Sequence, residues 1–171
     1  RKALGKIAST FYNNPSNSMF CIGITGTKGK TTTTYMIKSI LDQAGMTCGI
    51  IGTLGCISHN WTADTKHTTP ESLDIQKFLH KMHVSGEKAV AIEVSSHAIA
   101  LQRIQGIDFD IGVFTNIGHD HLDFHVSFNN YLATKASFFE KLSSDYDTGN
   151  INKKFRTSVI NVDDPNYSAI L

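Results

Sequence analysis

Short apolar runs alternate along the chain with longer segments whose apolar residues recur at helical spacing. The apolar runs predict buried strands at 19–25, 47–53, 89–94, 107–115 and 158–162. The amphipathic segments predict helices at 1–12, 30–44, 70–85 and 127–142, with a turn or short helix at 95–103. Strands that alternate with helices indicate parallel βαβ units. We therefore predict an α/β protein whose mostly parallel sheet is flanked by helices on both faces.

Two predicted helices carry details that a structure can test. For the helix at 70–85, Thr69 is the expected N-cap, Pro70 the first helical residue and Gly86 the stop. Its predicted inward face consists of Leu73, Phe78, Leu79 and Met82. The helix at 30–44 has its apolar residues at Tyr35, Met36, Ile37, Ile40, Leu41 and Ala44. The polar segments at 55–69, 116–126 and 144–156 are predicted to be loops or exposed stretches.

The loops with the most distinctive residues all follow predicted strands. They begin after Thr25, Val94, Thr115 and Val162. In a parallel sheet the carboxyl ends of the strands lie on one edge, and ligands bind there. We therefore expect these four loops to meet at one edge of the sheet.

The first of these loops has the spacing of a phosphate-binding loop. Residues 23–31 read Gly-Ile-Thr-Gly-Thr-Lys-Gly-Lys-Thr, between a strand and a helix. Glycines let backbone N–H groups converge on phosphate oxygens, and the helix N-terminus adds a positive dipole. Lys30 would reach the β- and γ-phosphates, and the Thr31 hydroxyl would ligate Mg²⁺. Ile24 replaces the first glycine of the general pattern, and a tight turn followed by a solvated lysine is the alternative.

The second loop follows Glu93, an acidic residue at the end of the strand at 89–94. A carboxylate beside a phosphate loop can hold Mg²⁺ directly or through water. A surface carboxylate that happens to follow a strand is the alternative. We favour metal binding because the phosphate loop is present in the same chain.

The third loop, residues 116–125, contains His119, His121 and His125 together with two aspartates. This density indicates a metal site or a proton-transfer site. Zinc is one possibility, although the Cys/His pairs of structural zinc motifs are absent. A polar loop without chemistry is the alternative, above all for His119 and His125. The remaining candidates are interpreted as solvated or locally hydrogen-bonded histidines: His59, His67, His80 and His83.

Composition narrows the class of protein. The 171 residues suffice for one domain, with 40% apolar and 18% charged residues. A net charge of +1 gives no field for a polyanion, so we expect no nucleic-acid partner. Three cysteines suit a reducing, cytoplasmic location, and Cys21 and Cys48 should pack as small hydrophobes. No run reaches the length of a membrane span, so we expect no membrane partner. The first residue is Arg1, so the chain is expected to be a piece of a longer protein.

The segment Ile-Thr-Gly-Thr-Lys-Gly-Lys-Thr-Thr resembles the ATP loop of the Mur ligases and the folylpolyglutamate synthases. Further matches follow in order: His-Thr-Thr-Pro-Glu at 67–71, Glu-Val-Ser-Ser-His-Ala at 93–98, and Val-Phe-Thr-Asn-Ile-Gly-His-Asp-His-Leu-Asp-Phe-His at 113–125. Ala-Thr-Lys at 133–135 and Asn-Val-Asp-Asp-Pro at 161–165 complete the set. The resemblance is strongest to the Mur ligases that add diaminopimelate or L-lysine. It implies the central ATP-binding domain, with a P-loop NTPase-like fold.

The resemblance also implies roles for individual residues. The nucleotide-binding set would be Gly26, Thr27, Lys28, Gly29, Lys30, Thr31, Thr32 and Asn116. Mg²⁺ would be held by Thr31, Glu93, His121 and a carbamylated Lys135, and the muramoyl-dipeptide substrate by Thr68, Thr69, Ser95 and Arg103. Lys30, His121 and Lys135 would act in catalysis. Leu101 and Val126 depart from the family pattern, which leaves the fine substrate contacts open.

The implied reaction joins an amino acid to UDP-N-acetylmuramoyl-L-alanyl-D-glutamate through an acyl phosphate formed with ATP and Mg²⁺. We expect residues 1–18 to be a linker with a short helix and residues 19–171 to be the ATP-binding domain of a monomer. Alone, this part should bind ATP weakly and should not ligate. Another Mur step, a folylpolyglutamate-type ligase, a small-molecule kinase and a non-catalytic nucleotide-binding module are the alternatives.

Overall fold

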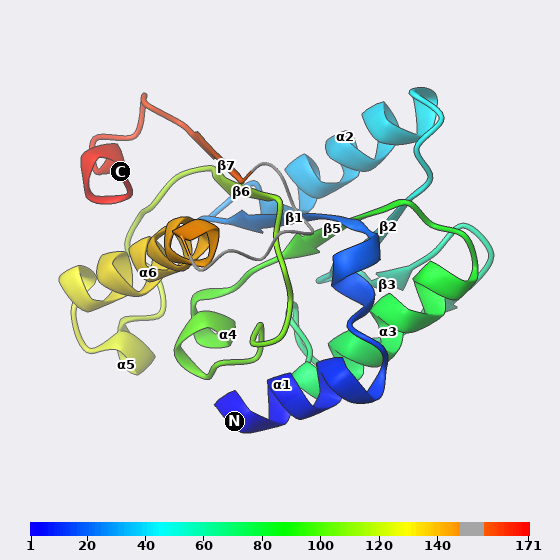
Figure 1. Cartoon of the computed structure of the whole chain (residues 1–171). Helices are drawn as coiled ribbons and strands as arrows, with labels where there is room; N and C mark the ends of the chain where they lie inside the picture. The colour runs from blue at the N-terminus through cyan, green and yellow to red at the C-terminus, as the bar shows by residue number, and fades with distance from the viewer. Residues whose placement is uncertain (148–155) are drawn as a thin grey trace.

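The computed structural model describes residues 1–147 and 156–171, which form a seven-stranded sheet with helices on both faces (Figure 1). The strands are β1 (Phe20–Thr25), β2 (Cys48–Gly52), β3 (Gly55–Ile57), β4 (Thr62–Ala63), β5 (Ala89–Glu93), β6 (Ile111–Phe114) and β7 (Thr157–Ile160). The helices are α1 (Lys2–Phe11), α2 (Lys30–Gln43), α3 (Ser72–Val84), α4 (Ser96–Ala100), α5 (Leu122–His125) and α6 (Phe128–Asp147), with 3₁₀ turns at Pro15–Ser18 and Tyr167–Ala169. Among the described helices, none is long and apolar enough to span a membrane.

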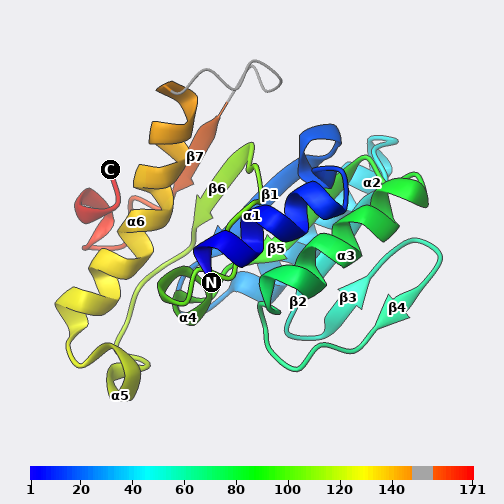
Figure 2. The same cartoon turned by 60° about the horizontal axis from the view of Figure 1, so that its bottom comes forward.

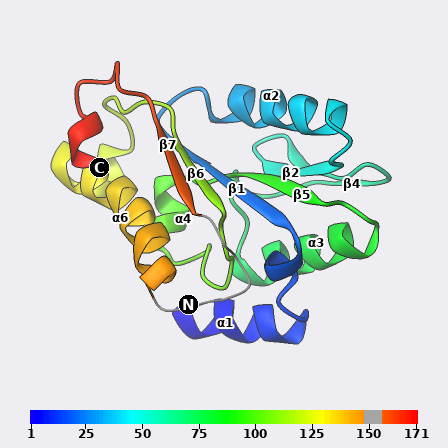
Figure 3. The same cartoon turned by 45° about the horizontal axis from the view of Figure 1, so that its top comes forward.

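The sheet has the strand order β4-β3-β2-β5-β1-β6-β7. The pairs β2–β5, β5–β1, β1–β6 and β6–β7 are all parallel. The predicted α/β class with a mostly parallel sheet is therefore confirmed. In Figure 3, β1, β6 and β7 run side by side through the middle of the molecule.

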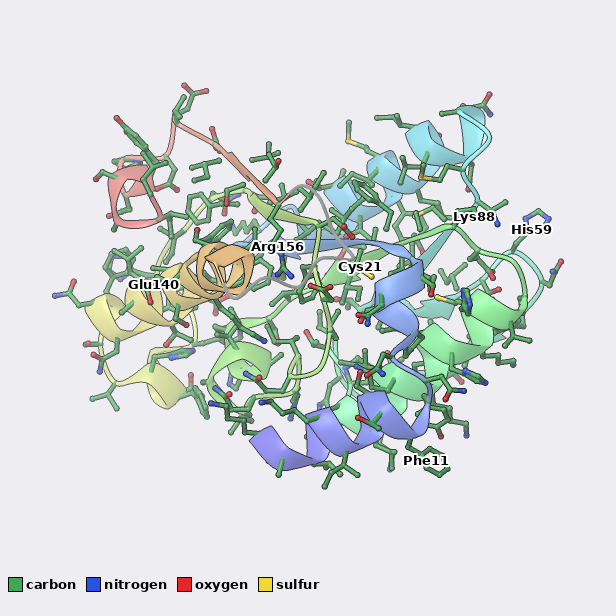
Figure 4. The ribbon with its side chains drawn as sticks, in the orientation of Figure 1. Phe11, Cys21, His59, Lys88, Glu140 and Arg156 are labelled. Atoms are coloured by element: carbon green, nitrogen blue, oxygen red, sulfur yellow. The ribbon has the colours of Figure 1, made fainter. Side chains whose placement is uncertain are left out.

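Two apolar layers hold the helices against the sheet. On one face Ile37 and Leu41 of α2 pack against Ile22, Ile24 and their neighbours. On the other face α3, α4 and α6 form the larger core, and α1 packs against α3 rather than directly on the sheet (Figures 1 and 3). The three cysteines are buried, unbridged members of these cores, as expected for Cys21 and Cys48. Figure 4 shows Cys21 in the interior and Phe11 at the outside of α1.

The helix details were partly wrong. α3 begins at Ser72 with Glu71 as its N-cap, because the hydroxyl of Thr69 turns instead toward β5. Leu73 is 47% exposed, and Gln76 is buried in the core that Leu73 was expected to join. In α2, four of the six apolar residues that recur at helical spacing are exposed rather than packed on the sheet: Tyr35, Met36, Ile40 and Ala44. Helical spacing alone does not say which face of a helix meets the sheet.

Two segments that were predicted to be loops contain regular secondary structure. Within 55–69, β3 and β4 form an antiparallel hairpin that extends the sheet beyond β2 (Figure 2). Within 116–126, residues 122–125 form α5. The predicted strand at 107–115 is regular only over 111–114. The segment 144–156 begins with the end of α6, and residues 148–155 lie outside the described part of the chain.

Candidate functional site

The carboxyl ends of β1, β5, β6 and β7 lie at one edge, so the four distinctive loops begin there as predicted. The loop after β1 comes first in the chain. Its glycines have backbone angles that other residues rarely adopt, with φ of +151° at Gly26 and +83° at Gly29. A Cβ on Gly26 would lie 1.9 Å from Oγ1 of Thr115, so the loop after β1 passes directly against the end of β6. Gly26 therefore permits a contact between the two loops.

Asn116 holds this loop by three hydrogen bonds. Its carbonyl oxygen accepts from the N–H of Thr27 at 2.8 Å. Its side-chain oxygen accepts from the N–H of Lys28, and its amide donates to the Lys28 carbonyl, each at 3.0 Å. The N–H groups of Thr27 and Lys28 are thus directed at Asn116. The first N–H groups of α2, at Lys30, Thr31 and Thr32, have no acceptor within the helix and face the loop.

Two lysines from different elements converge on the loop. Nζ of Lys30 donates to the carbonyls of Gly26 at 2.9 Å and Thr27 at 3.0 Å. Nζ of Lys135, from α6, donates to the same Gly26 carbonyl at 3.1 Å and lies 3.4 Å from Oγ1 of Thr25. The Lys135 side chain is only 1% exposed, and no described carboxylate forms an ion pair with it.

Burial changes the protonation of both lysines. The pKa of Lys135 is lowered to about 7, mainly by burial and next by the charge of Lys30, while the charge of Asp120 opposes the change. Burial also lowers the pKa of Lys30, against the opposing charges of Glu93 and Asp120. A large fraction of Lys135 is therefore the neutral amine near neutral pH.

Glu93 ends β5 as a buried carboxylate, 1% exposed, beside the start of α2. Oγ1 of Thr31 donates toward it and lies 3.0 Å from both carboxylate oxygens. The backbone N–H and the hydroxyl of Thr53 also donate to it, at 3.0 and 3.1 Å. The structure thus brings Glu93 and Thr31 into direct contact, whereas a surface carboxylate would be solvated.

The four substrate candidates lie on the other side of Glu93. Oγ1 of Thr69 donates to the backbone carbonyl of Glu93 at 2.7 Å and accepts from the N–H of Ser95 at 3.0 Å. Ser95 also caps α4 by accepting from the N–H of Ala98. Nη1 of Arg103 donates to the Thr69 carbonyl at 3.2 Å, and Nε lies 2.9 Å from Oε1 of Glu71.

Thr68 precedes this group and is partly exposed, with its hydroxyl 3.1 Å from that of Thr53. A cleft of about 460 Å³ opens beside the segment, between Asp64 and Phe78, with Lys66, His67 and Glu71 in its wall. The Thr68–Thr69 segment is therefore linked to Glu93 and flanked in sequence by His67 and Pro70, which line the cleft.

His121 is exposed and belongs to an aromatic cluster with His97, Phe124, His125 and Tyr131, through which it is connected indirectly to the loop after β1. Its ring centroid is 4.8 Å from that of His97 and 6.3 Å from that of Tyr131. The Tyr131 hydroxyl in turn lies 3.0 Å from Oγ1 of Thr27. The backbone of His121 has φ of +52°, a left-handed conformation that Asn13, Asn14, Gln102 and Val126 also adopt.

The other histidines differ in surroundings. His125 is 6% exposed, and burial lowers its pKa, with His97 as the next contributor. Burial likewise lowers the pKa of His97, followed by the charge of His121. His119 is exposed and stacks near Phe128. His59 lies in the β3–β4 turn at the rim of the molecule, remote from this cluster (Figure 4).

The donor set fits Mg²⁺ with phosphate better than a protein-only metal cage. Within residues 1–147 and 156–171, no group of three or more His, Cys, Asp or Glu side chains is arranged to hold a metal. The zinc alternative therefore has no support among the described residues. The carboxylate of Glu93 and the hydroxyl of Thr31 suit Mg²⁺, which is bound through one or two carboxylates plus phosphate oxygens.

Two residues of the site were missed by the sequence analysis: Thr53, which contacts Glu93, and Tyr131, which contacts Thr27. Asp120, one of the two aspartates noted in the third loop, acts on the pKa of both lysines. Thr53 follows β2 at the same sheet edge, but threonine after a strand is too common to be a signal.

Known proteins resemble this chain over most of its length. Residues 24–171 match the model of the Mur ligase middle domain. The UDP-N-acetylmuramoyl-L-alanyl-D-glutamate–2,6-diaminopimelate ligase of Caldanaerobacter subterraneus subsp. tengcongensis is 46% identical over 171 residues, covering 100% of this chain and 33% of the relative. The ligase of the same name from Geobacter metallireducens is 43% identical, with shares of 100% and 32%. The chain thus spans about a third of the curated relatives it matches.

Solved structures show the same fold. A structure of a UDP-N-acetylmuramoyl-L-alanyl-D-glutamate–2,6-diaminopimelate ligase superposes with a TM-score of 0.75 at 30% identity, covering 89% of this chain and 28% of that one. E. coli FolC in complex with DHPP and ADP superposes with a TM-score of 0.70 at 16% identity, covering 97% and 42%. The second likeness concerns the fold alone. Because the family model covers most of the residues, the chain belongs to the Mur ligase family, of which it contains the middle domain.

Proposed function

We propose that this chain is the ATP-binding part of a ligase that adds diaminopimelate or L-lysine to UDP-N-acetylmuramoyl-L-alanyl-D-glutamate. The observation that carries the proposal is the convergence of Lys30, Lys135 and the Thr31–Glu93 pair on one loop. These residues come from three separate elements, and their meeting gives cations for phosphate and oxygen ligands for Mg²⁺. The names of the relatives at 46% and 43% identity support this substrate class.

The loop and the start of α2 would hold the terminal phosphates of ATP. Their contacts would come from the N–H groups of Gly29, Lys30, Thr31 and Thr32 and from the Lys30 ammonium. The contribution of Gly26, Thr27, Lys28 and Asn116 is then to fix the shape of the loop. Mg²⁺, when bound, would neutralise phosphate charge, with the Thr31 hydroxyl, Glu93 and His121 as its candidate ligands.

The chemistry of the reaction explains why such a site is needed. A carboxylate is a poor electrophile, so the γ-phosphoryl group of ATP would be transferred to the D-glutamate side chain to give an acyl phosphate. The amine of the incoming amino acid would then form the amide and release phosphate. The residues of this chain would align the two reactants and balance the charge of the transferred group.

Lys135 would act after carbamylation. The neutral amine, available because the pKa is about 7, would attack CO₂, form an N–C bond and lose a proton. The product is an anionic carbamate, which replaces a cation that would repel Mg²⁺ by an oxygen ligand. Buried next to the Gly26 carbonyl, Lys135 is the site where this change of sign would matter most. Intact mass in the presence of CO₂, or density at Nζ, would show the added carboxyl group.

The substrate would approach from the cleft beside Thr68. The hydroxyls of Thr68, Thr69 and Ser95 could hydrogen-bond the substrate. Arg103 could donate from Nη2, because Nη1 contacts the Thr69 carbonyl and Nε lies beside Glu71. In the structure Arg103 chiefly shapes the segment that carries Thr69. The assignment of residues 1–18 as a linker and 19–171 as the ATP-binding unit, and a monomeric, cytoplasmic ligase, are parts of the same proposal.

Ligation by the full-length protein tests the function directly. The protein is assayed with ATP, Mg²⁺ and UDP-N-acetylmuramoyl-L-alanyl-D-glutamate, with diaminopimelate and L-lysine as competing amines. Amide formation with either amine supports the proposal, and Lys135→Ala should abolish it. ATP binding without amide formation would indicate a nucleotide-binding module, and glutamate addition to a folate would indicate a folylpolyglutamate-type ligase.

A further inference from the structure

The carboxylate of Glu93 lies across the end of the neighbouring strand β2. Ile51 pairs with Ile92, so Gly52 lies beside Glu93 and Thr53 lies just beyond the paired residues. A Cβ on Gly52 would lie 2.2 Å from Oε1 of Glu93. Only a residue without a side chain therefore leaves room for the carboxylate at this point.

Thr53 uses two different groups to hold the two carboxylate oxygens. Its backbone N–H donates to Oε1 at 3.0 Å, and its hydroxyl donates to Oε2 at 3.1 Å. Two donors on two oxygens fix the plane of the carboxylate, which a single hydrogen bond would not. Thr31 contacts the same carboxylate from α2.

The hydroxyl of Thr53 also connects Glu93 to the substrate segment, since it lies 3.1 Å from the hydroxyl of Thr68. The Thr53 hydroxyl has a single proton, which it can donate to Oε2 of Glu93 or to the hydroxyl of Thr68, so the two acceptors compete for it. Thr69 donates to the backbone carbonyl of Glu93 at 2.7 Å. Adjacent threonines are therefore tied to both the side chain and the backbone of Glu93.

We propose that Thr53 is a positioning residue that orients the Glu93 carboxylate toward Mg²⁺ and couples it to the Thr68–Thr69 segment. The inference rests on the proposed function, because it assigns Glu93 to the metal. It explains how substrate bound at Thr68 would alter the metal site. A substrate that engages the Thr68 hydroxyl would change the hydrogen bonding of the Thr53 hydroxyl, and with it the bond to Oε2 of Glu93.

The test compares four variants of the full-length protein. Thr53→Val removes the hydroxyl and keeps the backbone donor, and Thr53→Ser keeps both. Thr47→Val is the matched control. Thr47 directly precedes the first residue of β2, and its hydroxyl donates to the Gly86 carbonyl. Thr53 is exposed, so Thr53→Val should fold, and Thr53→Ala serves as a second variant without the hydroxyl.

The first measurement needs no ligand. The side-chain carboxyl ¹³C resonance of Glu93, assigned with Glu93→Gln, should move in Thr53→Val and Thr53→Ala and stay unchanged in Thr53→Ser and Thr47→Val. The second is Mn²⁺ affinity with a non-hydrolysable ATP analogue, followed by electron paramagnetic resonance. Loss of a group that orients a metal ligand lowers affinity 10–100-fold, and we expect about tenfold because the backbone donor remains.

The coupling has its own measurement in the ligation reaction. Thr68→Val and Thr53→Val should raise the KM for the muramoyl substrate non-additively, because each breaks the same chain. An unchanged Glu93 resonance in Thr53→Val, or equal Mn²⁺ affinities in all variants, would overturn the inference. Wild-type protein that binds neither Mn²⁺ nor nucleotide would refute the proposed function instead, while the resonance would still decide whether Thr53 orients Glu93.

Discussion

Lys30 and Lys135 both donate to the carbonyl oxygen of Gly26, at 2.9 and 3.1 Å. One lysine begins the helix after the loop and the other comes from the middle of α6, more than a hundred residues later. Burial is the main cause that lowers the pKa of Lys135, and the like charge of Lys30 on the same acceptor adds to it. With its pKa lowered to about 7, Lys135 can react as a neutral amine near neutral pH.

Lys135 should make stability depend on pH. The unfolded lysine has its ordinary pKa of 10.5, so from about pH 7 to 10.5 the unfolded chain binds more protons and stability rises with pH. Below about pH 7 the full penalty, roughly 5 kcal/mol, is present. Between pH 7 and pH 9, wild-type protein should gain roughly 2 to 3 kcal/mol of unfolding free energy relative to Lys135→Met.

Urea denaturation in CO₂-free buffers measures this difference. Lys135→Met should also be the more stable protein at low pH, because a neutral side chain of similar length replaces a buried cation. Parallel pH profiles for the two proteins would show that Lys135 keeps an ordinary pKa.

Gly26→Ala should disrupt the loop more than a positive φ alone explains. The new Cβ would lie 1.9 Å from Oγ1 of Thr115 and 2.9 Å from the carbonyl of Asn116. We expect a loss of about 3 kcal/mol of unfolding free energy, and loss of nucleotide binding. Gly45→Ala is the control, because Gly45 has φ of +77° with nothing within 4 Å, and should lose only about 1 kcal/mol. Equal losses would mean that the contact with Thr115 is unimportant.

Lys30→Met should weaken ATP binding without unfolding the protein. A hydrogen bond to a charged group is worth roughly 1.5 to 3 kcal/mol, so the dissociation constant should rise about 10- to 100-fold. Calorimetry with an ATP analogue on the full-length protein measures it. Lys77→Met, on the exposed side of α3, should leave the affinity unchanged. If the two variants bind equally well, Lys30 does not contact phosphate.

Arg103→Lys should raise the KM for the muramoyl substrate about tenfold, because a lysine cannot replace the fork that contacts both the Thr69 carbonyl and Glu71. The unfolding free energy should fall by about 1 kcal/mol. Arg1→Lys is a matched control, since the Arg1–Glu71 pair is exposed and should contribute less than about 0.5 kcal/mol. A KM that does not change would show that this segment does not meet the substrate.

Local sequence was enough to predict much of the fold. The alternation of apolar runs and amphipathic segments gave five of the strands and the main helices within a few residues, because each depends on its own residues. The β3–β4 hairpin was missed because its strands are short and derive their hydrogen bonds from β2. The sequence did not show that Tyr35 and Ile40 of α2 are exposed, because the burial of a helix residue depends on what packs opposite it.

The sequence by itself determined the loop at 23–31, Glu93 and the His-rich loop as candidates, since spacing and residue type express those features directly. Only the tertiary structure decided that Lys135 lies buried against Gly26 and that Thr53 holds Glu93. Loss of water around an amine, and a hydrogen bond across 40 residues, are properties of the surroundings rather than of any segment. The order of the strands brings β2 beside β5, and this arrangement places Thr53 against Glu93.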